Sequence, residues 1–176
     1  MLIVYDRKTE KIVGHCSRVF HDGKWREATM DEILPNEDKT NLASVYFPDD
    51  ARFIGYGVSS WRLRKDENGL VVGLERLPAI QINCDAKDND GDDVPDVPAD
   101  GTSVVRITVT TADSSDTDIT FRTTRGALSQ RTVHTNKGQG RVDLRAPTET
   151  VAVVVTASAE GYRPADLKLE FVPVGK

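Results

Sequence analysis

The sequence predicts a mostly β protein, in which a small N-terminal α+β domain of β-hairpins precedes a C-terminal β-sandwich. Apolar and polar residues alternate most clearly over residues 104–111, where Val105, Ile107 and Val109 would share a buried face. Turn-forming residues then recur about every 8–12 positions toward the C-terminus. An acidic stretch at residues 85–100 divides the 176-residue chain, which favours two small units over one large one.

Residues 1–78 carry the signals of short hairpins and one short helix. We expect strands at residues 2–5, 11–14, 16–20, 42–47, 60–65 and 70–76, with Trp25 beginning the return from a turn at residues 21–23. Asn68-Gly69 is the strongest of the hairpin signals, because both residues tolerate the left-handed backbone of a two-residue turn. Thr29 and Glu32 have the spacing of a capping box, which predicts a helix of one or two turns that ends at Pro35.

Residues 79–176 read as a series of short strands. We expect them at residues 80–82, 104–111, 118–124, 131–135, 141–146, 151–157 and 166–171. The run at 151–157 is apolar on both faces, which is typical of a central strand. About seven strands separated by regular turns predict an immunoglobulin-like β-sandwich, and the lack of a Cys-Trp-Cys spacing excludes the antibody type.

The acidic loop at residues 85–100, between the first and second expected strands of the sandwich, offers a candidate calcium site. Calcium loops place carboxylates at alternate positions around a glycine, here Gly91. The candidate ligands are Asp88, Asp90, Asp92, Asp93 and Asp96. In an EF-hand frame, however, the first and twelfth ligand positions hold Ala86 and Val97. The alternative is a solvated acidic linker, kept extended by charge repulsion and stiffened by Pro95 and Pro98.

The composition argues against several other classes of function. A net charge of −5 and the absence of a Lys/Arg cluster argue against a nucleic-acid partner. No apolar run approaches the roughly 20 residues of a membrane span, and the first residues turn polar too soon for a signal peptide. The only two cysteines, Cys16 and Cys84, form at most one disulfide and are expected as packed free thiols. No phosphate-binding glycine loop or nucleophile motif is present, so we do not expect an enzyme.

Aromatic residues are concentrated in the N-terminal half of the chain. Tyr56, between two glycines, and Trp61 are the candidate partner-binding residues, because aromatic side chains on a surface bind proteins or sugars. The alternative is that these aromatic residues form the core of a small domain that has few other large apolar groups.

Five motifs in the C-terminal unit occur in an order that resembles a known family. They are ADGTS at 99–103, ITV at 107–109, ITFRTTRGALS at 119–129, GRVDL at 140–144 and VVVTAS at 153–158. Over residues 79–174 the chain resembles the bacterial immunoglobulin-like domain of the invasin/intimin type. It departs from that family at residues 112–116, which replace an Asn-Pro-Val-rich turn, and at residues 137–140, which replace an Asp-Gly turn.

The resemblance implies a rigid spacer or display module, found in adhesins and on tail and capsid proteins of bacterial viruses. The N-terminal pattern is similar to leading modules of phage structural proteins. We therefore expect a non-enzymatic structural protein of a phage or phage-like particle, located in the virion, with virion proteins or further copies of itself as partners. The alternative is a bacterial surface adhesin or carbohydrate-binding module that meets a cell-surface ligand.

Overall fold

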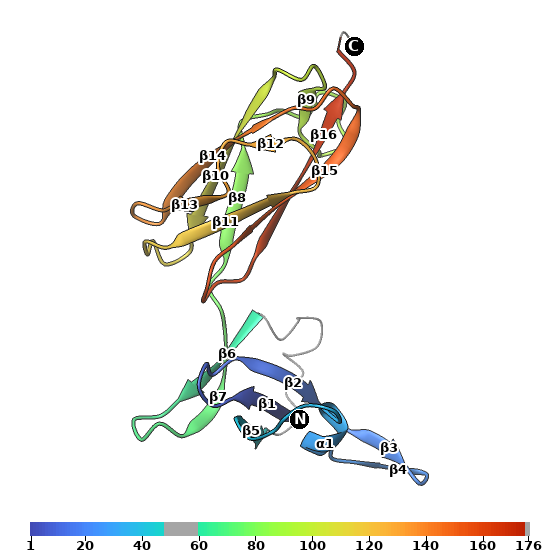
Figure 1. Cartoon of the computed structure of the whole chain (residues 1–176), viewed down its shortest axis with the longest axis vertical. Coiled ribbons are helices and arrows are strands. Elements are labelled where there is room, and N and C mark those ends of the chain that lie inside the picture. The colour runs from blue at the N-terminus through green and yellow to red at the C-terminus, as the bar shows by residue number, and fades with distance from the viewer. Residues whose placement is uncertain (48–59, 175–176) are drawn as a thin grey trace. The chain divides into compact units, whose positions relative to one another are not determined.

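The computed structural model describes residues 1–47 and 60–174, so Tyr56 and the glycine-containing run around it lie outside the described residues. The chain divides into two compact units, Met1–Leu77 and Pro78–Lys176, which are described separately (Figure 1). Within the described ranges, no helix has the length and apolarity needed to cross a membrane.

The N-terminal unit is built from one small sheet, two hairpins and one helical turn. Its elements are β1 (Leu2–Asp6), β2 (Ile12–Cys16), β3 (Val19–His21), β4 (Lys24–Arg26), α1 (Met30–Ile33), β5 (Leu42–Tyr46), β6 (Trp61–Lys65) and β7 (Val71–Arg76). The sheet has the order β2-β1-β5, and β3–β4 and β6–β7 are separate hairpins. These strands match the sequence predictions closely, except that Cys16 ends β2 instead of beginning the next strand.

Its core is small because only a few apolar side chains are fully covered. Met1, Ile3 and Leu63 form the buried centre, and Phe47 packs against it. Helix α1 lies against β2 at Gly14, where an added Cβ atom would come within 2.6 Å of the Ile33 side chain. The Glu32 part of the predicted capping box is present, since its carboxylate accepts the Thr29 amide hydrogen at 2.9 Å.

The C-terminal unit is a sandwich of two antiparallel sheets with one parallel addition at an edge. Its strands are β8 (Ile80–Cys84), β9 (Asp96–Pro98), β10 (Val104–Thr111), β11 (Asp118–Thr123), β12 (Ala127–Leu128), β13 (Thr132–His134), β14 (Gln139–Arg145), β15 (Val151–Ser158) and β16 (Ala165–Val172). One sheet has the order β12-β14-β10-β8 and the other β13-β11-β15-β16-β9. This is the immunoglobulin-like β-sandwich that the sequence predicts.

The sandwich core follows from the alternation seen in the sequence. Val105, Ile107 and Val109 are all at most 2 % exposed, while the residues between them face solvent or are partly covered. Phe121 and Phe171 are the largest side chains that the opposite sheet contributes. Strand β15 lies between β11 and β16, which confirms the central position predicted from its two apolar faces.

Two short strands, β9 and β12, were not expected from the sequence. β9 lies within the acidic stretch and pairs in parallel with the end of β16, so that Val97 is only 4 % exposed. The stretch is therefore not the extended linker that charge repulsion alone predicts. Backbone pairing and burial of Val97 and Ala99 hold its C-terminal part against the sandwich.

Candidate functional site

The acidic loop between β8 and β9 brings three of the five predicted calcium ligands together. Carboxylate oxygens of Asp88, Asp90 and Asp96 lie within 4.8 Å of one another. Asp92 and Asp93 are not part of this group. Hard cations such as Ca²⁺ take six to eight oxygen ligands, so three carboxylates would leave much of the coordination to water or backbone.

Several carboxylate oxygens of this loop already accept hydrogen bonds from the loop's own backbone amides. Asp88 accepts the amide hydrogens of Gly91 at 2.7 Å and Asp93 at 2.9 Å, and these bonds lower the pKa of its carboxyl group. Asp90 behaves oppositely, because the neighbouring charge of Asp92, followed by desolvation and the charge of Asp96, raises the pKa of its carboxyl group. The loop is thus a folded turn in which the Asp90 carboxylate is repelled by the neighbouring negative charges. Calcium binding by this loop stays a prediction.

The aromatic side chains of the N-terminal unit divide between core and surface. Trp61 is half-buried in β6, opposite Arg76, and does not stand out as an exposed platform. Phe20 and Trp25 are 62 % and 66 % exposed on the β3–β4 hairpin, with ring centroids 5.3 Å apart. Asp22 and Gly23 both have positive φ angles, so a two-residue turn fixes this aromatic pair. Trp25 is therefore the more accessible of the two tryptophans.

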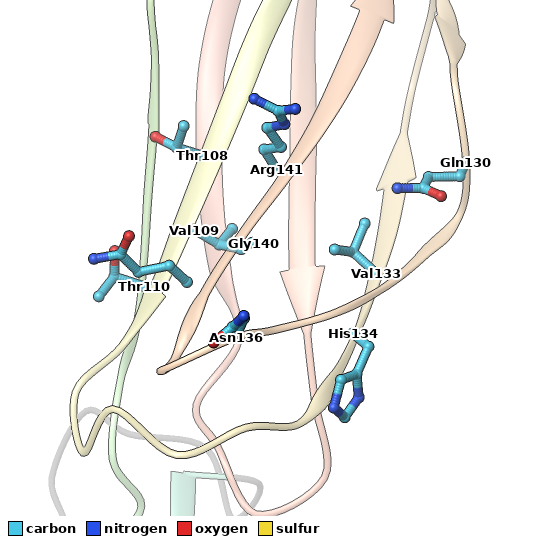
Figure 2. Close-up of a pocket in the computed structure, with 10 residues that line it drawn as sticks. Thr108, Val109, Thr110, Gln130, Val133, His134, Asn136, Gly140 and Arg141 are labelled. Carbon is cyan, nitrogen blue, oxygen red and sulfur yellow. The ribbon is translucent and has the colours of Figure 1, made fainter.

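A polar groove lies at one edge of the sandwich, between β14 of one sheet and β13 of the other. It is open to solvent, measures about 770 Å³ and is lined from β10, β13, β14 and the segment before β13. Figure 2 shows Gln130 and Val133 pointing from one wall toward the strand that carries Arg141. Gly140 lies between Val109 and Val133, and an added Cβ atom there would come within 3.3 Å of both. The missing side chain thus lets the two sheet edges approach closely at the base of the groove.

A rigid turn closes one end of the groove. Asn136 and Gln139 exchange both backbone hydrogen bonds, at 2.8 and 3.0 Å, around Lys137 and Gly138, which both have positive φ angles. The turn is tied to the sandwich by the amide of Gly138, which donates to the Asp116 carboxylate at 3.1 Å. The side chains flanking this turn are therefore held on a fixed backbone.

Most polar side chains of the groove have no partner inside the protein. In the part of the chain that the structure describes, no hydrogen bond or ion pair involves the side chains of Gln130, Asn136, Gln139 or Arg141. No carboxylate is among the residues that line the groove. The His134 side chain does have a partner, because its Nδ1 atom lies 2.8 Å from Asp118 Oδ1 in a hydrogen bond. The sequence carries no signal for this groove, because its residues come from separate elements, each of which resembles an ordinary polar strand or turn.

Comparisons with known proteins give no family assignment. No family model matches the sequence, and no curated protein matches it. Among solved structures, a C-terminal 282-residue fragment of intimin, in complex with the intimin-binding domain of the translocated intimin receptor, is 24 % identical, with a TM-score of 0.43. That alignment covers 52 % of this chain and 32 % of the fragment.

Two further intimin structures have a similar fold. The D0-D1 domain is 23 % identical over 53 % of this chain and 48 % of its own, with a TM-score of 0.44. The D00-D0 domain is 15 % identical over 97 % of this chain and 84 % of its own, with a TM-score of 0.46. This chain thus spans about a third and a half of the first two structures, and at these identities the likeness concerns the fold alone.

Proposed function

We propose that this protein is a non-enzymatic attachment and display protein with an adhesin-like role at a surface. The N-terminal unit docks to a larger assembly, and the immunoglobulin-like sandwich presents its polar surface to a ligand. The distribution of exposed apolar side chains carries this proposal. Among the described residues, six of the eight exposed large apolar side chains lie in the N-terminal unit: Val13, Phe20, Trp25, Tyr46, Leu70 and Val72.

The sandwich has the properties of a rigid carrier. Its core is continuous across both sheets, and only Val104 and Val174 are large apolar side chains exposed on its described surface.

The proposal also concerns which assembly carries the protein. A bacterial cell surface is the assembly that we favour, and a phage or phage-like particle, with the protein as a tail or capsid appendage, is the second. Antibody labelling and protease treatment of intact cells, compared with purified virus particles from the same culture, distinguish the two. Detection only inside cells, with neither surface nor particle labelled, would contradict the display role.

Docking through the N-terminal unit is tested by replacing Trp25, the most exposed aromatic side chain among the described residues of that unit. Trp25→Ser is expected to reduce retention on the assembly without unfolding the protein, because Trp25 is 66 % exposed. Val104→Ser is the matched control, since Val104 is 56 % exposed on the sandwich. Equal retention of both variants and the unmodified protein would show that the hairpin surface does not dock.

A further inference from the structure

We propose that the groove between β13 and β14 binds an acidic saccharide, that is, a sugar chain carrying a carboxylate. This inference rests on the proposed adhesin-like role and names the ligand class of the sandwich. Its first support is the set of unpartnered polar side chains already described: Gln130, Asn136, Gln139 and Arg141. A ligand with hydroxyl groups would supply partners that the protein itself does not.

The mixture of side chains favours a sugar over an apolar ligand or a simple anion. Three of these side chains, those of Gln130, Asn136 and Gln139, are neutral amides, each of which both donates and accepts hydrogen bonds. A sugar hydroxyl also donates and accepts, so it pairs with an amide in either sense. Val109 and Val133 are the only large apolar residues of the lining, and both are buried in the core at 1 % and 9 % exposed, so the groove offers too little apolar surface for a hydrophobic ligand.

The charges around the groove favour a carboxylate on that sugar. Arg141 is the only lining side chain with a permanent charge, and no carboxylate lines the groove to neutralise it. The nearest acidic residue along β14 is Asp143, two positions further on the same face, and it lies 3.7 Å from Arg106. Guanidinium groups bind carboxylates through two parallel hydrogen bonds, which gives both affinity and orientation.

The groove is also preorganised for such a ligand. Asn136 and Gln139 flank the two-residue turn, Gly140 and Arg141 belong to β14, and Arg141 is opposite Thr108 in the β10 register. Side chains mounted on paired strands lose less backbone freedom on binding than side chains of a loop do. The volume of about 770 Å³ lies within the usual range of ligand sites.

Titration of the full chain with matched sugars tests the proposal. Sialyllactose and trigalacturonate are the acidic probes, lactose is the neutral control, and an oligoglutamate peptide tests for a general response to acidic polymers. Binding is followed by calorimetry and by chemical-shift changes of backbone amides in β13 and β14. We expect both acidic sugars to bind at millimolar concentration or better, more tightly than lactose and the peptide, and to bind more weakly as salt is raised.

Variants assign the binding to the groove. Arg141→Gln is expected to lower the affinity for sialyllactose about tenfold or more, because a hydrogen bond to a charged group is lost. Arg145→Gln is the matched control, since Arg145 is exposed four residues further along the same strand and does not line the groove. It should bind as the unmodified protein does.

Several outcomes would overturn the proposal. They are no binding of either acidic sugar at millimolar concentration, equal binding of lactose, tighter binding of the peptide, and equal loss in the Arg141→Gln and Arg145→Gln variants. Unchanged melting temperatures of both variants exclude unfolding as the cause. The titration is made in solution and does not depend on where the protein resides, so its failure is distinguishable from failure of the surface-labelling test.

Discussion

Substituting Gly138 by alanine should destabilise the sandwich far more than the same substitution at Gly161. Both glycines have a left-handed backbone, with φ angles of +70° and +78°. At Gly161 an added Cβ atom meets nothing within 4 Å, whereas at Gly138 it would lie 2.4 Å from Thr111 Oγ1 and 2.5 Å from Ser114 Cα. The pair thus separates backbone strain from steric conflict.

The magnitudes follow from the contacts at each site. Gly161→Ala incurs only the left-handed strain, about 1 kcal/mol. Gly138→Ala adds an overpacking cost of about 1–3 kcal/mol, because Thr111 is buried and Ser114 meets the new methyl group through its backbone. It also strains the bonds from Thr111 N to Gly138 O and from Gly138 N to Asp116, each contributing about 1 kcal/mol. Together with the left-handed strain, the sum is about 4–6 kcal/mol.

Hydrogen exchange is the suitable assay, because it resolves the two units. Both tryptophans, Trp25 and Trp61, are in the N-terminal unit, so fluorescence does not report on the sandwich. Peptides covering β10 and β14 should lose most of their protection in Gly138→Ala and little in Gly161→Ala. At about 4–8 °C per kcal/mol, the melting temperatures should fall by about 5 °C for Gly161→Ala and by at least about 16 °C for Gly138→Ala. Equal losses in the two variants would refute the steric argument.

Three further predictions concern the units separately. Phe121→Ala should lower the urea stability of the sandwich by about 3–5 kcal/mol, measured by hydrogen exchange, and leave the tryptophan fluorescence transition in place; a shift of both transitions would show that the units unfold together. Hydrogen bonds from Arg26, the larger cause, and from the Thr29 amide lower the pKa of the Glu32 carboxyl group to about 2. The stability that ionised Glu32 contributes is therefore complete above its ordinary pKa of 4.5 and is lost as the pH falls toward 2. Glu32→Gln should therefore flatten the acid dependence of the fluorescence transition, whereas Glu67→Gln should not. Calcium at about 100 times its dissociation constant should stabilise the sandwich by about 2.7 kcal/mol relative to EDTA, and Asp90→Asn should abolish the difference; identical melts would identify the loop as a structural acidic turn.

How far the sequence predicts this fold depends on how local each signal is. Strand β10 was predicted over its full length, because its alternation and its preceding Asp-Gly turn lie within 13 residues, 99–111. Strand β9 was missed because its three residues, which follow Pro95 and end with Pro98, carry no periodicity, and its partner β16 lies more than 60 residues away. β12 has only two residues, which is too short for any pattern.

The candidate sites show the same limit. The acidic loop was found from the sequence because its aspartates are contiguous, although only the structure separates the Asp88 group from Asp92 and Asp93. Composition does not distinguish the exposed Trp25 from the half-buried Trp61, because this depends on what packs over each hairpin. The groove depends on Gln130 and Arg141 lining it from two separate elements, and no spacing in the sequence encodes that arrangement.

The chain's acidity does not argue against an acidic ligand, because the negative charge is concentrated at one place. Residues 85–100 contain seven aspartates and one lysine, a net charge of −6, so the rest of the chain carries −5 − (−6) = +1. The end of that stretch at Asp85 meets β10 at Arg106, whose amide hydrogen the Asp85 carboxylate accepts at 2.8 Å, and Asp90 follows five residues later in the loop. The groove closes at Thr110, opposite Gln139, about 13 Å further along β10 from Arg106 at 3.3 Å per residue. Salt screens exposed charges within about 8 Å at physiological ionic strength. Asp90→Asn should therefore leave the affinity for sialyllactose unchanged at physiological salt, and a clear gain in affinity there would show that the acidic loop and the groove act on each other.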